Sequence, residues 1–163
     1  MLADAPQFLV ALEQSAWGAA IRQSTWAYPI ANSGHILALT LFASAVAIMD
    51  LRILGAFAAT APARVIYPAR WAAMLGFALM AITGLTLFTA EASHVAMNSV
   101  FQLKAVLIAL GLLNALLIAG PSLAKIADLP PNVPLPARAR TAAVISFAIW
   151  IAVAACGRLI AYF

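Results

Sequence analysis

Four long apolar segments constrain the fold of this chain more than any other feature of its sequence. They cover residues 30–49, 71–90, 100–119 and 142–162. Each has about the twenty residues needed to cross a hydrocarbon core about 30 Å thick. Because lipid offers no hydrogen bonds to an exposed backbone, segments of this kind are helical. The sequence therefore predicts an all-α integral membrane protein, an antiparallel four-helix bundle.

The composition agrees with a membrane protein. Of 163 residues, 66% are hydrophobic and only 9% are charged, whereas soluble domains carry about a quarter charged residues. The net charge of +4 comes from scattered basic residues, without the basic stripe typical of nucleic-acid binding. We expect one membrane domain over residues 1–163, with the lipid bilayer as its main surroundings and no nucleic-acid partner.

The segments outside the four spans predict two further features. Residues 4–23 have apolar positions at helical spacing, which predicts an amphipathic helix in the membrane interface before the bundle. Residues 120–137 contain five prolines, which favours an extended loop over a regular helix. Asp50 and Arg52, in DLRILG, are expected to form a structural ion pair.

Basic residues predict the orientation of the bundle. Those in the first and third connections would all lie on one side: Arg52, Arg64, Arg70, Lys125, Arg138 and Arg140. The positive-inside rule makes that side cytoplasmic. We therefore expect a multi-pass protein of a bacterial inner membrane, with both termini in the periplasm and a cytoplasmic loop over 120–137.

In that topology every helix brings an ionisable group to the periplasmic half. These groups are His35, Glu91, His94, Lys104 and Arg158. Charged groups at membrane depth are costly and usually face the bundle interior, a cavity or a partner. Each residue also has an ordinary explanation. His35 could be a buried imidazole bonded to a nearby oxygen, and the basic side chains could reach the membrane surface. Their convergence predicts a site.

A b-type haem is the first hypothesis for this site. Imidazole is a common axial ligand of haem iron, so His35 would be one ligand and His94 a candidate second. Lys104 and Arg158 would pair with the propionates, and Glu91 would tune the site or relay protons. Three glycines and an alanine would make room for the macrocycle: Gly76, Gly84, Gly111 and Ala115. His94 lies higher than His35 by about 10 Å, which leaves a single histidine ligand as an alternative.

On this hypothesis the protein transfers electrons to or from quinol or a periplasmic redox partner, with a quinone pocket at the same residues as a variant. A second hypothesis is copper or small-cation handling by His35, His94 and Met97. Glu91 and His94 also form Glu-x-x-His, which di-iron sites use in pairs, but the chain has one copy. A third hypothesis is a membrane anchor or assembly subunit of a homo-oligomer or larger complex.

Several stretches resemble a known family. WAYPIANSGHILAL, DLRILG, FQLKAVLIALGLLNALL and the terminal GRLIAYF are similar to those of small four-helix bacterial membrane proteins of unknown function. The resemblance runs from about Trp26 to Phe163. It implies a four-helix fold and gives weight to the polar residues inside those stretches: His35, Asp50, Arg52, Lys104 and Arg158. A fainter likeness to copper-resistance D-type proteins and small b-type cytochromes rests on a helical histidine in a four-helix bundle.

Overall fold

The computed structural model describes residues 5–126 and 129–162, and in these ranges it contains helices and no strands. The elements in chain order are α1 (Gln7–Glu13), α2 (Ala16–Gln23), α3 (Ala27–Leu54), α4 (Pro62–Ala90), α5 (Ala92–Met97), α6 (Ser99–Leu113), the π-helix η2 (Asn114–Ala119), α7 (Gly120–Ile126) and α8 (Ala137–Leu159).

Four helices are long and apolar enough to span a membrane, as the sequence predicted. They are α3, α4, the stretch Ser99–Leu116 and α8. Only 11–39% of the residues in each span are buried inside the chain. Large apolar side chains such as Leu37, Trp71 and Leu116 are therefore exposed, which suits contact with lipid. The predicted all-α membrane bundle is confirmed.

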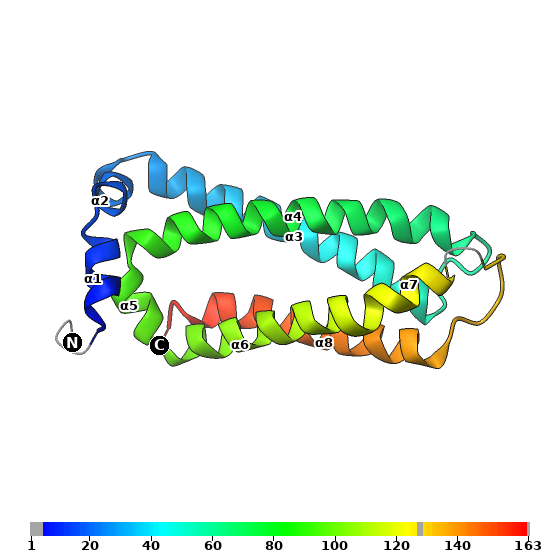
Figure 1. Cartoon of the computed structure of the whole chain (residues 1–163). Coiled ribbons are helices and arrows are strands. Elements are labelled where there is room, and N and C mark those ends of the chain that lie inside the picture. Colours follow the sequence, from blue (N-terminus) through cyan, green and yellow to red (C-terminus); the bar gives the residue numbers. More distant parts are fainter. Residues whose placement is uncertain (1–4, 127–128, 163) are drawn as a thin grey trace.

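The spanning helices form two pairs (Figure 1). α3 packs along α4, and α6 with η2 packs along α8. α3 crosses towards the second pair and contacts α8. The short helices α1, α2 and α5 lie at the same end of the bundle as the C-terminus, which we call the terminal end. The connections from α3 to α4 and from α7 to α8 lie at the opposite end, the loop end.

Small residues bring the backbones of α3 and α4 together in the middle of the bundle. A Cβ atom on Gly76 would lie 2.8 Å from the backbone nitrogen of Phe42, so only glycine allows this approach. Phe42 also contacts Trp150 of α8 edge-on, with ring centroids 4.6 Å apart. Trp150 in turn covers Gly111 of α6, where a Cβ would lie 2.9 Å from the indole. This aromatic cluster joins the two helix pairs.

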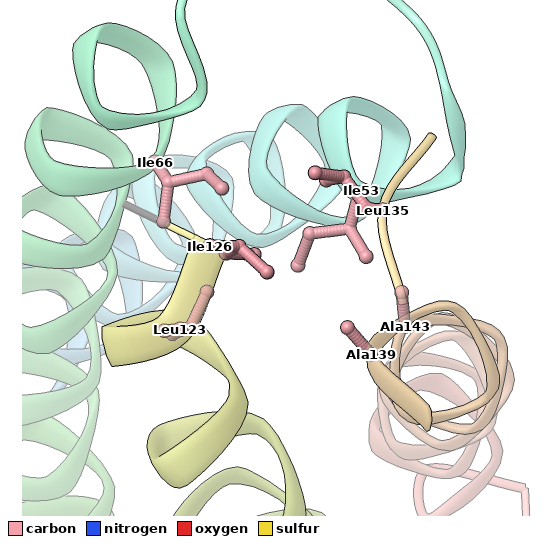
Figure 2. Packing of buried hydrophobic residues seen from close by; sticks show 7 residues of the cluster. All are labelled: Ile53, Ile66, Leu123, Ile126, Leu135, Ala139 and Ala143. Atoms are coloured by element: carbon pink, nitrogen blue, oxygen red, sulfur yellow. The ribbon is translucent and has the colours of Figure 1, made fainter. Parts of the chain in front are cut away.

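A second apolar cluster closes the loop end. Figure 2 shows its side chains turned towards one another from four helices and from the segment that precedes α8. Its members are Ile53, Ile66, Leu123, Ile126, Leu135, Ala139 and Ala143. Ile126 is completely buried between α3, α4 and α8, so α7 anchors the end of the third span.

The expected helix over 4–23 is instead two helices, α1 and α2; residue 4 itself lies outside the described ranges. Ser15 starts a new helix because its hydroxyl accepts a hydrogen bond from the backbone N–H of Gly18, at 3.2 Å. Gly18 then packs tightly on the end of α4. A Cβ there would lie 2.8 Å from the carbonyl oxygen of Thr89.

The structure also corrects the predicted boundaries near prolines. α4 begins at Pro62, since the first turn of a helix needs no N–H donor, and it continues through Pro68. The expected loop over 120–137 is wrong for its first part, where α7 runs over Gly120–Ile126 with Pro121 in its first turn. α8 begins at Ala137, directly after Pro136, and ends at Leu159. The connection between α4 and α6 contains the short helix α5.

The close approach at Gly76 predicts a specific sensitivity to side-chain volume. We expect Gly76→Ala to lower the free energy of unfolding by about 1–3 kcal/mol, because overpacking displaces the α3 backbone. Thermal unfolding in detergent measures the effect. Gly34→Ala is the matched control at the same interface, since a Cβ there meets only the Thr83 methyl at 3.5 Å. Equal stability of both variants would contradict the tight contact.

Candidate functional site

His35 lies about two turns inside α3 and is half-buried against α4. Its ring rests on Gly84, where a Cβ would lie 3.1 Å from the imidazole Cε1. Its Nδ1 atom is 2.9 Å from the hydroxyl oxygen of Thr83. The α3–α4 pairing therefore fixes both the position of the imidazole and the direction of its plane.

The hydrogen bonds of Thr83 assign the tautomer of His35. The Thr83 hydroxyl donates to the carbonyl oxygen of Leu79, one turn earlier in α4, at 2.7 Å. With its hydrogen engaged there, the Thr83 oxygen accepts from His35 Nδ1–H. A neutral imidazole that carries its hydrogen on Nδ1 has its free lone pair on Nε2. The structure thus leaves Nε2 as a base or metal ligand.

Lys104 reaches the same region from the other helix pair. It lies on α6 and is half-buried, and its Nζ atom would be 3.4 Å from a Cβ on Gly157 of α8. The Lys104 charge influences the His35 imidazole. These two of the five predicted site residues both lie in the terminal-end half of the bundle, on different helix pairs.

His94 and Glu91 lie nearer the membrane surface. Glu91 marks the break between α4 and α5, and His94 lies on α5; both are exposed. Thr83, which contacts His35, is seven residues before the end of α4 at Ala90. That separation is about 10 Å at 1.5 Å per residue. The structure therefore does not bring the two imidazoles together in a single chain.

Arg158 also points away from His35. Its Nη2 atom donates to the Tyr162 hydroxyl at 2.8 Å, and its guanidinium lies 5.1 Å from the centre of that ring. Met97 is 49% exposed. Within the described ranges, no three His, Cys, Asp or Glu side chains gather as a metal site. A copper site built on such a group is therefore not preformed there.

The glycines expected to make room for a cofactor are largely filled by protein. Gly76 contacts the α3 backbone, Gly111 is covered by Trp150, and Gly84 is covered by His35 itself. A flat cofactor therefore does not fit at Gly76 or Gly111. By its chemistry the donor set suits a haem, since one imidazole and the ammonium of Lys104 lie in the terminal-end half of the bundle.

The structure also reveals a contact that the sequence did not predict. The Glu13 carboxylate accepts hydrogen bonds from the backbone N–H of Ser93, at 2.9 Å, and from the Ser93 hydroxyl. Arg22 donates from Nη1 to the carbonyl oxygens of Glu13 and Ala90, both at 2.7 Å. This latch, formed by Glu13, Arg22 and Ser93, ties α1 and α2 to the corner between α4 and α5. Ser93 lies in the first turn of α5. A serine near the start of a helix was the one feature of the sequence that could have indicated this contact.

Comparison with known protein families gives a match over most of the chain. The model of a family of unknown function, DUF6644, covers residues 15–163, so the chain belongs to this family. The resemblance inferred from the sequence motifs is thereby confirmed. No curated protein and no solved structure matches the chain.

The latch predicts a pH response at the terminal end. The hydrogen bonds from Ser93, with smaller help from the charges of Arg22 and His94, lower the pKa of Glu13 below its usual value. A depressed carboxyl pKa stabilises the folded latch above the unfolded pKa of about 4.3 and loses that effect as the pH falls below it. We expect α1 to be held at pH 7 and released as the pH falls through the lowered pKa of Glu13.

Electron paramagnetic resonance of a nitroxide attached at Gln7→Cys measures this release. Glu13→Gln should give the mobile spectrum already at pH 7. Glu91→Gln, which removes an exposed carboxylate, is the matched control. A Glu13→Gln protein with an immobile label at pH 7 would rule out the latch.

Proposed function

We propose that this DUF6644 member is a membrane-embedded electron-transfer protein that holds a b-type haem in the terminal-end half of its bundle, with His35 as an axial ligand. The observation that carries the proposal is the assigned tautomer of His35. Its Nδ1–H is held by Thr83, and its Nε2 lone pair is free.

The contacts of His35 are those that a metal-binding histidine needs. Such histidines donate their second ring N–H to an oxygen, which fixes the ring and raises its basicity. Here the chain of hydrogen bonds from His35 to Thr83 to the Leu79 carbonyl has this role. Haem supplies reversible one-electron chemistry when it is bound. The protein's own contribution is to orient the ligand and keep it within an apolar helix pair.

Lys104 is the proposed propionate partner. It is half-buried, comes from the opposite helix pair and acts electrostatically on the His35 site. A propionate carboxylate would form a charge-assisted hydrogen bond with its ammonium. His94 and Glu91 lie at the exposed surface beyond it. We assign them to the surface that a redox partner approaches, and we propose His35 as the one axial ligand from a single chain.

The proposal also includes the membrane in which the protein lies and the side that each end of the bundle faces. The exposed basic side chains Arg64, Arg70, Lys125, Arg138 and Arg140 lie towards the loop end. The positive-inside rule then supports a cytoplasmic loop end in a bacterial inner membrane. The terminal end, with His35, would face the periplasm. Its electrons would come from or go to quinol or a periplasmic redox protein.

An absorption spectrum of detergent-purified protein from haem-replete cells tests this proposal. We expect a sharp b-type α-band after dithionite reduction in the wild-type protein and its loss in His35→Ala. His94→Ala is the matched control and should keep the band. A colourless wild-type protein, or a His35→Ala protein with an unchanged spectrum, would overturn the proposal.

Thr83 gives a finer test of the ligand geometry. Thr83→Val keeps the shape of the side chain but removes the acceptor for His35 Nδ1–H. Loss of such a supporting hydrogen bond typically weakens metal binding about 10–100-fold. We expect that loss in haemin titrations of the apoprotein.

Thr86→Val is the control for Thr83→Val. The Thr86 hydroxyl bonds the carbonyl of Ile82 in its own helix at 2.9 Å, as the Thr83 hydroxyl bonds Leu79. Haemin affinity equal in both variants would show that Thr83 does not support the ligand.

A further inference from the structure

The loop-end half of the bundle contains a buried carboxyl group that the proposed haem site does not use. Asp50, on the last turns of α3, is 2% exposed. Among the residues that the structure describes, its Oδ2 atom has no hydrogen-bond partner. An ionised carboxylate in an apolar interior without a partner is very costly and in practice becomes neutral.

The expected ion pair between Asp50 and Arg52 is not made. Residues two apart in a helix point to different sides. Arg52 instead donates from Nη2 to the carbonyl oxygen of Thr60 at 2.8 Å, and its Nε has no partner. Arg52 is therefore not the group that neutralises Asp50 Oδ2.

Two polar side chains, one from α8 and one from η2, lie at this level of the bundle. The Ser146 side chain of α8 is within hydrogen-bonding reach of the Asp50 carboxyl group. Asn114, at the start of η2, donates from Nδ2 to the carbonyl oxygen of Ala142 at 3.0 Å. In an α-helix the carbonyl of residue 142 points to the backbone N–H of residue 146. Asn114 therefore lies at the same turn of α8 as Ser146.

Asn114 is also incompletely bonded. It is 5% exposed, and its Oδ1 atom has no partner. At one turn of α8 there are thus two buried oxygen atoms, Asp50 Oδ2 and Asn114 Oδ1, that accept hydrogen bonds and lack a donor. Asn114 begins a π-helix, a distortion often found at functional positions.

We infer that Asp50, Ser146 and Asn114 form a proton-binding site in which Asp50 binds and releases a proton on Oδ2. Binding converts the carboxylate to a neutral acid and so removes an unpaired charge from the apolar interior; release returns the proton to water. A hard metal ion would need about six oxygen ligands, more than these three side chains supply. A water molecule could satisfy the hydrogen bonds but would leave the charge buried.

Other charged groups near that end do not replace the proton. The helices that pack on α3 are α2, α4 and α8. The basic residue of α2, Arg22, belongs to the latch at the terminal end. The remaining titratable side chains of α4, α7 and α8 towards the loop end are exposed: Arg64, Tyr67, Arg70, Lys125, Arg138 and Arg140.

Infrared spectroscopy with isotope-labelled aspartate tests the site in the full-length protein. The chain has three aspartates, at positions 4, 50 and 128. In an Asp4→Asn/Asp128→Asn protein, ¹³C-aspartate therefore reports on Asp50 alone. We expect an isotope-shifted carbonyl band of a protonated carboxylic acid at neutral pH. It should disappear as the pH is raised while circular dichroism stays unchanged.

Two variants and one ion sharpen the test. Ser146→Ala should shift the band and its pH midpoint because a hydrogen bond is lost, whereas Ser33→Ala, exposed on α3, should not. Absence of an isotope-shifted acid band at every pH at which the protein is folded would overturn the inference. Removal of the band by Na⁺ at constant pH would show a metal-cation site and also overturn it. Neither result depends on whether the protein binds haem.

Discussion

The close approach of α3 and α4 at Gly76 is the contact on which the rest of the structure depends. It fixes how the two helices are aligned along their length. Thr83 and Gly84, about two turns further along the same face of α4, then meet His35 of α3. The packing that holds the pair together therefore also positions the imidazole and assigns its tautomer.

Two polar levels follow from this arrangement, separated by an apolar one. His35 and Lys104 belong to the terminal-end half, and Asp50, Ser146 and Asn114 to the loop-end half. Phe42, Phe77 and Trp150 fill the space between the helix pairs in the middle of the bundle. Polar groups in an apolar protein interior persist only where partners satisfy them. Among the described residues, His35 Nε2 has no hydrogen bond at the first level, and Asp50 Oδ2 and Asn114 Oδ1 have none at the second.

The spans were predictable because the apolar length needed to cross a membrane is a property of the sequence alone. The residues at which the helices begin and end were less predictable. α4 begins at Pro62, before the predicted span, and Pro121 lies in the first turn of α7 where a loop was predicted, since a first-turn proline loses no hydrogen bond. His35 and Lys104 both lie in the terminal-end half of the bundle, and a shared site there stays a prediction. The sequence grouped His94 and Arg158 with them because of their predicted depth. In the structure His94 is exposed on the short helix α5, and Arg158 is hydrogen-bonded to Tyr162.

The sequence by itself determined the four apolar spans and the half of the bundle in which each ionisable group lies, because hydrophobic length and residue order set both. The tertiary structure decided which of those groups meet. Direction around a helix, and the partner found there, depend on packing between distant segments. That packing separated Asp50 from Arg52, joined Glu13 to Ser93, and gave His35 the oxygen of Thr83 that leaves its second nitrogen free.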